Sequence, residues 1–237
     1  MHEKKTSNPK KSTKYQPRGL TILYEDRDII VIDKPAGLLS MGTDREKEKT
    51  AYFMLNTYVK KGNPRSRDRI FIVHRLDRDT SGLLVFAKNE KAKRYLQDNW
   101  KDFDKKYAAV VQGILPEKEG VITSYLAENT SFRVYSVANP EKGKLSKTGY
   151  RVMKESEKYS LLEITLFTGR KNQIRVHLSD EGHPVVGDKV YGEKDKTIKR
   201  LALHSASLKI LHPFTKKEMV FETEIPPYFK ALVKGKQ

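Results

Sequence analysis

Residues 74–89 read HRLDRDTSGLLVFAKN and begin with a highly charged connection, which lies between two apolar runs. The runs IFIV (70–73) and LLVFA (83–87) have the β-branched and aromatic composition of core strands. A polar loop held at both ends by core strands is a common place for chemistry. Asp77 or Asp79 can serve there as a nucleophile or a general base, with the neighbouring arginines keeping it ionised.

The residues alone leave the role of this loop open. Asp79, Thr80 and Ser81 can equally cap backbone amides, with the Arg–Asp pairs forming surface salt bridges. His74 and Asp77 would offer only two ligands to a metal ion, which is a weak site, so we expect no bound metal. An active site and a structural loop therefore stay equal alternatives at this point, and residue chemistry does not distinguish the two aspartates.

On either side of the loop, the first half of the chain predicts short strands and two helices. The runs LTILY (20–24) and IIVID (29–33) flank the polar segment EDRD and predict a hairpin. Apolar residues recur at helical spacing between 50 and 61. Asn89 can cap a second helix that runs to about Trp100.

Strands dominate the second half of the chain. They are expected at YAAVVQG (107–113), GVITSYL (120–126), TGYRVMK (148–154), YSLLEITLF (159–167), HSASLKIL (204–211) and MVFET (219–223). A helix over 172–181 should end at Gly182, and Pro226 and Pro227 open a last short helix. Strands outnumber helices without alternating strictly with them. This pattern predicts an α+β fold with a mixed, largely antiparallel sheet flanked by helices and loops.

The composition favours a polyanionic partner. The chain has 47 Lys and Arg against 30 Asp and Glu, a formal net charge of +17, and this indicates nucleic acid. The absence of cysteine excludes disulfides and thiolate zinc sites. No apolar run reaches the roughly 18 residues that span a bilayer, and the N-terminus lacks a signal-peptide core. We therefore expect a cytoplasmic protein without membrane contact.

The charge also suggests how the chain is organised. Residues 1–18 carry six basic side chains against the single Glu3 and almost no apolar residue, so we expect a disordered tail. This tail is either a basic arm that binds nucleic acid or a solubilising segment. No linker divides the remainder, so residues 19–237 are predicted to form one domain.

The run HRLDRDTSGLLVFAKN resembles the defining motif of the RluA-type pseudouridine synthases. In that family the aspartate after the leucine is the nucleophile, which implies Asp77. Asp79 falls at a variable position and is expected to serve the loop. The resemblance also implies that Arg75 inserts into the RNA when the target base is flipped out, with His74 beside it as a further RNA contact.

Three further segments are similar to the companion motifs of the family in the same order. IIVIDKPAGLLS (29–40) resembles its lysine-proline turn, where Lys34 can contact phosphate or simply belong to the turn. KKYAAVVQG (105–113) resembles its lysine-x-tyrosine strand, which implies that Tyr107 packs on the base and transfers a proton. By composition alone, Tyr107 is an ordinary core aromatic. RLALHSASL (200–208) implies that Leu203 packs under the base.

The segment TGRKNQIRVHLSDEGHPVVGDKVYG (168–192) resembles the family's remaining motif. It implies that Arg175 pairs with the catalytic aspartate, which such a charge-assisted contact would keep ionised and aimed. Arg170, Gln173 and His177 are expected to surround this site and bind RNA, although the same residues also suit a solvated helix face. Family members usually have histidine where this chain has Asn172.

The resemblance implies a pseudouridine synthase fold with an active-site cleft across the sheet, and an isomerase that flips uridine out of structured RNA. Ribosomal RNA is favoured over transfer RNA. The reaction needs no metal and no nucleotide or other cofactor, and we expect a monomer. The tail is too short to form a separate RNA-binding module of the S4 type. A non-catalytic RNA-binding or ribosome-assembly protein on the same fold is the alternative.

Overall fold

The computed structural model describes residues 17–43, 46–192, 198 and 200–234, so most of the predicted basic tail lies outside the described residues. The chain folds into two compact units. The first contains residues up to Trp100 together with Leu211–Lys217. The second contains Lys101–Ile210 and the residues from Glu218 on. Each unit therefore combines segments that are distant in the sequence.

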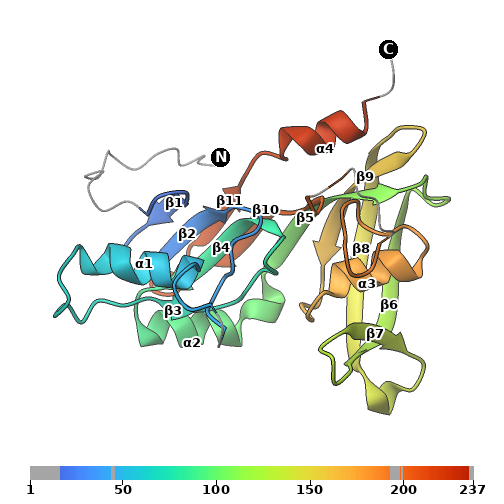
Figure 1. Cartoon of the computed structure of the whole chain (residues 1–237). Coiled ribbons are helices and arrows are strands. Elements are labelled where there is room, and N and C mark those ends of the chain that lie inside the picture. Colours follow the sequence, from blue (N-terminus) through green and yellow to red (C-terminus); the bar gives the residue numbers. More distant parts are fainter. Residues whose placement is uncertain (1–16, 44–45, 193–197, 199, 235–237) are drawn as a thin grey trace. The chain divides into compact units, whose positions relative to one another are not determined.

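The first unit is built on a small antiparallel sheet (Figure 1). Its strand order is β1 (Thr21–Glu25), β2 (Ile29–Lys34) and β4 (Ser81–Ala87), and the short β3 (Phe71–Ile72) also pairs with β4. The predicted hairpin is therefore confirmed. Every residue of β4 is buried, and continuous apolar strands of this kind are covered on both faces. The charged loop thus leads into a rigid core strand.

Two capped helices accompany this sheet. Helix α1 (Ala51–Lys60) begins after Thr50, whose side chain accepts a hydrogen bond from the Phe53 amide at 3.1 Å. Helix α2 (Glu90–Asp98) begins after Asn89, whose side chain accepts from the Ala92 amide at 2.8 Å. These bonds satisfy amides at the helix start that have no partner within the helix. The predicted Asn89 cap is confirmed, and the helix ends slightly earlier than expected.

The second unit contains a larger sheet of antiparallel neighbours. The strand order is β10 (Leu203–Leu211), β5 (Asp104–Gln112), β9 (Tyr159–Leu166), β8 (Lys144–Glu155), β6 (Glu119–Glu128) and β7 (Val134–Val137). Strand β11 (Glu218–Glu222) pairs with β10. Strand β7 was not predicted, because its four residues lie in a polar stretch and its pairing with β6 is not visible in the local sequence.

Helix α3 (Gln173–Asp180) packs against β6, β7 and β8, and α4 (Pro227–Leu232) contacts β5 and β9. Helix α3 ends where predicted: Gly182 has φ +80°, and the His183 amide donates to the Leu178 carbonyl at 2.9 Å. None of the helices in the described residues is long and apolar enough to span a membrane. The observed elements confirm the predicted α+β class with a largely antiparallel sheet.

Candidate active site

The ammonium group of Lys34 anchors the charged loop in the first unit. The side chain is fully buried, and Nζ donates to the carbonyl oxygens of Pro35 at 3.0 Å, Leu38 at 2.7 Å and Arg78 at 3.0 Å. An ammonium group has three N–H donors, and these bonds use all of them. The prediction that Lys34 contacts RNA phosphate is therefore wrong, because a buried cation with every donor engaged holds the loop instead.

A second anchor is Ser40, whose only sequence signal is its place at the end of IIVIDKPAGLLS. Its hydroxyl donates to the Leu76 carbonyl at 2.7 Å and accepts from the Leu76 amide at 3.0 Å. On the other side, the Gly37 amide donates to the Arg78 carbonyl at 2.9 Å, and Arg78 Nε donates to the Gly37 carbonyl at 3.2 Å. The residues immediately before and after Asp77 are thus both fixed by the turn that follows β2.

The two aspartates of the loop differ in their surroundings. Asp77 is half-buried, whereas Asp79 is exposed. Burial lowers the pKa of Lys34 to about 8, while the negative charges of Asp79, Asp77 and Asp33 act in the opposite direction. Asp77 therefore combines partial burial, fixed neighbours on both sides and a nearby buried cation. These are the properties expected of a positioned reactive carboxylate.

His74 holds the start of the loop. Its Nε2 accepts a hydrogen bond from the Val85 amide at 3.1 Å, and its ring stacks on Trp100 with centroids 4.0 Å apart. The structure therefore gives the half-buried His74 an anchoring role, and its contact with RNA stays a prediction. Arg75 is exposed, as a side chain that reaches into RNA must be.

Arg175 of α3 is held in a clamp inside the second unit. Its Nε and Nη2 donate to the two carboxylate oxygens of Asp188, both at 2.7 Å, and Nη1 donates to Oδ1 of Asn172 at 2.9 Å. The Asp188 side chain is fully buried and that of Arg175 is 12% exposed. A bidentate pair fixes the plane of the guanidinium group as well as its position. The family motif gave no hint of Asp188 as the partner of Arg175 within this unit.

The Asp188 carboxylate is itself fixed by the backbone. Its Oδ1 accepts hydrogen bonds from the amides of Val190 at 2.9 Å and Tyr191 at 3.0 Å. Burial acts to raise the pKa of Asp188, but the hydrogen bonds and charge of Arg175, together with those two amides, outweigh it and bring the pKa below its ordinary value. The pair therefore stays ionised at neutral pH, which keeps the guanidinium group in one orientation.

Asn172 and Tyr191 complete the clamp. Asn172 has φ +53° and makes no side-chain cap bond to α3. Its side chain instead accepts from Arg175 and donates from Nδ2 to the Tyr191 hydroxyl at 3.2 Å. The Tyr191 ring lies 5.1 Å from the Arg175 guanidinium carbon. Asn tolerates this left-handed conformation better than most residues, as does the histidine that the family usually has here, so the change at 172 keeps a residue suited to this backbone.

Two other residues of this motif face the interior of the second unit. Gln173 is 2% exposed, accepts from the Arg170 amide at 3.0 Å and donates to Thr148 Oγ1 at 2.8 Å. His177 is fully buried between Thr148 Oγ1 at 2.9 Å and Ser124 Oγ at 3.0 Å, and burial lowers its pKa. The predictions that Gln173 and His177 contact RNA are wrong, because both side chains join α3 to the sheet. Arg170 is exposed and stays a candidate.

Tyr107 and Leu203 lie on adjacent strands and share one face of the sheet. In the β5–β10 register, Leu203 is opposite Ala109 and Ser205 is opposite Tyr107. Residues two apart in a strand point to the same face, so Tyr107 and Leu203 are diagonal neighbours there. Both are buried. Burial leaves little of either side chain accessible in this structure, so their packing on the target base stays a prediction.

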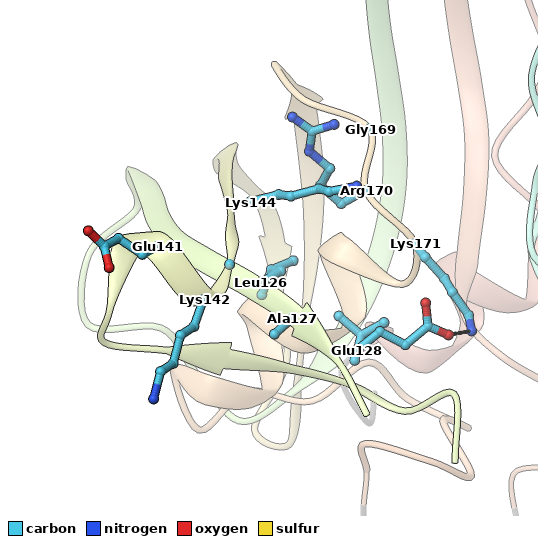
Figure 2. Close-up of a pocket in the computed structure, with 11 residues that line it drawn as sticks. Leu126, Ala127, Glu128, Glu141, Lys142, Lys144, Gly169, Arg170 and Lys171 are labelled. Carbon is cyan, nitrogen blue, oxygen red and sulfur yellow. Dashed lines mark hydrogen bonds and ion pairs between the residues drawn. The ribbon is translucent and has the colours of Figure 1, made fainter. Parts of the chain in front are cut away.

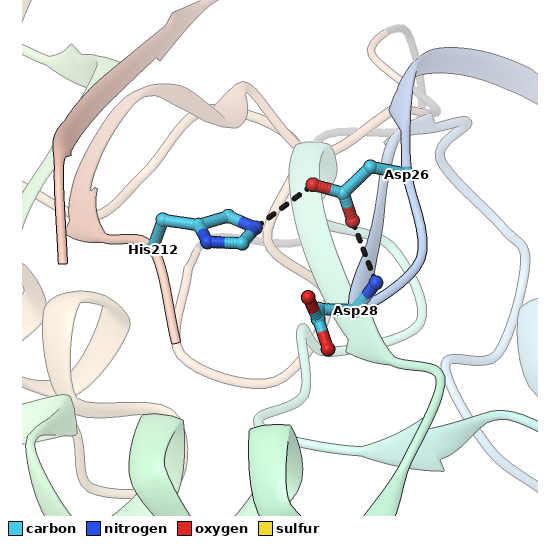
Figure 3. Close-up of side chains that lie close together, drawn as sticks. All are labelled: Asp26, Asp28 and His212. Atoms are coloured by element: carbon cyan, nitrogen blue, oxygen red, sulfur yellow. Dashed lines mark hydrogen bonds and ion pairs between the residues drawn. The ribbon is translucent and has the colours of Figure 1, made fainter. Parts of the chain in front are cut away.

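A separate cluster in the first unit joins Asp26, Asp28 and His212 (Figure 3). Their potential ligand atoms lie within 4.8 Å of one another. The Asp26 carboxylate accepts from the Asp28 amide at 2.7 Å, the Ile29 amide at 2.8 Å and the Tyr24 hydroxyl at 2.8 Å, and lies 2.8 Å from His212 Nε2. These bonds tie the β1–β2 turn to the segment after β10, which is a sufficient structural role for the cluster.

Comparison with known proteins identifies the family of the chain. The family model described as RNA pseudouridylate synthase matches residues 28–180. An uncharacterised RNA pseudouridine synthase of Bacillus subtilis is 35% identical over 90% of this chain and 71% of its own length. A protein of Zymomonas mobilis named ribosomal large subunit pseudouridine synthase D is 34% identical over 91% of this chain and 72% of its own.

Solved structures show the same fold. The human protein named RNA pseudouridylate synthase domain containing 1 superposes with a TM-score of 0.73 and 26% identity, over 94% of this chain and 90% of that one. The chain belongs to the RNA pseudouridylate synthase family, and it is an enzyme that converts uridine to pseudouridine in RNA. The RluA-type resemblance is confirmed, and the alternative of a non-catalytic protein on this fold is not favoured.

Proposed function

We propose that the protein isomerises uridine in ribosomal RNA, with Asp77 as the nucleophile. The observation that carries the assignment is the loop around Asp77, where Leu76 is fixed by Ser40 and Arg78 by Lys34. The choice of ribosomal RNA is supported by relatives whose names specify the large ribosomal subunit.

Each proposed role follows from the chemistry of the reaction. The bond between C1′ of the ribose and N1 of the uracil breaks, the base turns, and a bond forms from C1′ to C5, whose proton moves to N1. As the nucleophile, Asp77 attacks the ribose or the ring, and Arg175, held in one orientation by Asp188, is the cation that the family resemblance assigns to the same site. Tyr107 and Leu203 pack on the detached base, which must be kept from water.

The target atoms are inaccessible in a stacked helix, so the uridine must leave the stack. Arg75 fills the vacated position, and Arg170 contacts the RNA backbone. Atoms only move within one nucleotide, so the reaction consumes no nucleotide cofactor. We expect the enzyme to act as a monomer.

Asp77→Asn should reduce pseudouridine formation by roughly ten-thousand-fold, because loss of a nucleophile removes the reaction path itself. The test maps pseudouridine in total RNA from cells that lack the gene and carry either wild-type or Asp77→Asn protein. Asp79→Asn is the matched control, a carboxylate-to-amide change two residues away, and should restore the modification.

The same maps test the substrate. A site in ribosomal RNA that disappears with the gene and returns with the wild-type protein supports the proposal. Restoration of the site by Asp77→Asn would refute the nucleophile, and a site found only in transfer RNA would refute the substrate.

A further inference from the structure

The turn between β6 and β7 presents one aromatic side chain to solvent. The Asn129 side chain accepts from the amides of Ser131 at 3.0 Å and Arg133 at 2.9 Å, and the backbone N–H of Asn129 donates to the Arg133 carbonyl at 3.0 Å. Phe132 lies within this closed turn with φ +60°, and it is 74% exposed. A bulky side chain in the left-handed region is strained and marks a position for which a functional explanation should be sought.

Lys171 fixes a positive charge beside this ring. Its Nζ donates to the Phe132 carbonyl at 2.9 Å, forms an ion pair with Glu128, and lies 5.4 Å from the centre of the Phe132 ring. The turn is therefore held from inside by Asn129 and from outside by Lys171. A residue whose backbone is already fixed loses less conformational freedom when a ligand stacks on its side chain.

Lys171 also lines a groove of about 480 Å³ (Figure 2). Four basic side chains line it, against two acidic ones. They are Lys142, Lys144, Arg170 and Lys171, with Glu128 and Glu141. The charge of Glu128 is compensated by its ion pair with Lys171, so the groove keeps a positive balance. Lys171 links the two features, because it lines the groove and lies 5.4 Å from the centre of the Phe132 ring.

We propose that the β6–β7 turn and this groove form a second RNA-binding site, which takes an unpaired nucleotide of the substrate RNA. The base stacks on Phe132 and the neighbouring phosphate lies in the groove. This inference rests on the proposed function, since it assumes an RNA substrate. Every base has a face that can stack on an aromatic ring, and lysine and arginine compensate phosphate charge. An adjacent cation strengthens both contacts.

The first test measures binding of the purified full chain to a fluorescein-labelled single-stranded RNA of mixed sequence. Phe132→Ala should weaken binding roughly 5- to 100-fold, the range found for loss of one stacked base. Phe132→Tyr should bind like wild type, and Phe132→Leu should be as weak as Phe132→Ala. Phe214→Ala is the matched control: Phe214 is 78% exposed in the other unit, and its loss should leave binding unchanged. Thermal midpoints should not change in any of these variants.

The second test concerns the groove. Lys144→Ala should lower the slope of log K against log salt by about 0.7, the value for one phosphate contact on single-stranded nucleic acid. Wild-type affinity in Phe132→Ala or Phe132→Leu, or binding of poly-glutamate as tight as that of the RNA, would overturn the proposal. Modification assays separate the hypothesis of a second RNA-binding site from the hypothesis that Asp77 is the nucleophile. Phe132→Ala should raise KM with little change in kcat, whereas Asp77→Asn abolishes turnover and leaves RNA binding intact.

Discussion

Lys34 in the first unit and Arg175 in the second are both cations removed from water, but different groups stabilise them. Neutral backbone carbonyls surround the Lys34 ammonium, so its charge still acts on the carboxylates of the charged loop. The Arg175 guanidinium faces a buried carboxylate that compensates its charge and fixes its plane. Lys34 thus shapes a loop and keeps a titratable charge, whereas Arg175 is oriented and insensitive to pH near neutrality.

The largest effect should follow from removing the carboxylate that holds Arg175. Asp188→Asn leaves a nearly buried guanidinium uncompensated, so the free energy of unfolding should fall by about 3–5 kcal/mol. Misplacement of the guanidinium group should also reduce kcat on the order of 100-fold. Chemical denaturation and single-turnover modification assays measure the two effects.

Glu163→Gln is the control for Asp188→Asn. Glu163 forms ion pairs with Lys106 and Arg151 at the surface, so its loss should cost less than about 1 kcal/mol. If Asp188→Asn and Glu163→Gln have equal stability and equal activity, the Arg175–Asp188 pair contributes no more than the surface ion pairs of Glu163.

The next effect is a pH dependence that only Lys34 should cause. Its pKa in the folded protein is about 8. Deprotonation removes one donor and the charge that acts on the loop, so kcat should fall about tenfold between pH 7 and pH 9. Lys34→Met should have lower activity at pH 7 and should lack this descending limb.

The contribution of Lys34 to the free energy of unfolding should rise over the pH range in which kcat falls. The pKa of Lys34 is lowered from 10.5, so between pH 8 and pH 10.5 the unfolded chain binds more protons than the folded chain. The contribution of this group to the free energy of unfolding therefore rises with pH. A loss of activity above pH 8 then reflects the loop and not unfolding. A descending limb that persists in Lys34→Met would assign the titration to another group.

The smallest effect concerns the left-handed position at the start of α3. Asn172→Gly keeps the φ of +53° available but loses the bonds to Arg175 and Tyr191, which should cost about 1 kcal/mol and a few-fold in kcat. Asn172→Ala adds backbone strain and should cost about 1 kcal/mol more. If the two variants are equally stable in denaturation experiments, the conformation of residue 172 carries no strain.

The local sequence predicts most of the helices and strands, but it predicts few of the side-chain contacts between distant segments. The Asn89 cap, the first hairpin and the Gly182 helix end follow from residue types and spacing within a few positions. The family resemblance assigns Lys34, Gln173 and His177 to RNA, but the structure buries all three side chains. Their partners come from other strands and turns, as with Thr148 for both Gln173 and His177, and a single sequence does not show this proximity.

The candidate site was predictable to a similar degree. The motif separated Asp77 from Asp79, but it contained no sign that Ser40 fixes Leu76. Asp188 stands inside the quoted segment 168–192, yet its role depends on the turn that brings its carboxylate back onto α3. Strand β7 and the exposed Phe132 likewise depend on pairing with β6.

The hydrogen bonds of Lys34 affect which side chains of the loop can change during the evolution of the enzyme. Its ammonium group binds carbonyl oxygens, which every amino acid carries, and not the side chains of Pro35, Leu38 or Arg78. Substitutions at 38 or 78 can therefore alter what the loop presents to RNA without removing the bonds that Lys34 makes to its backbone. A lineage with this architecture can acquire new target sites by changing loop side chains while the reaction itself is preserved.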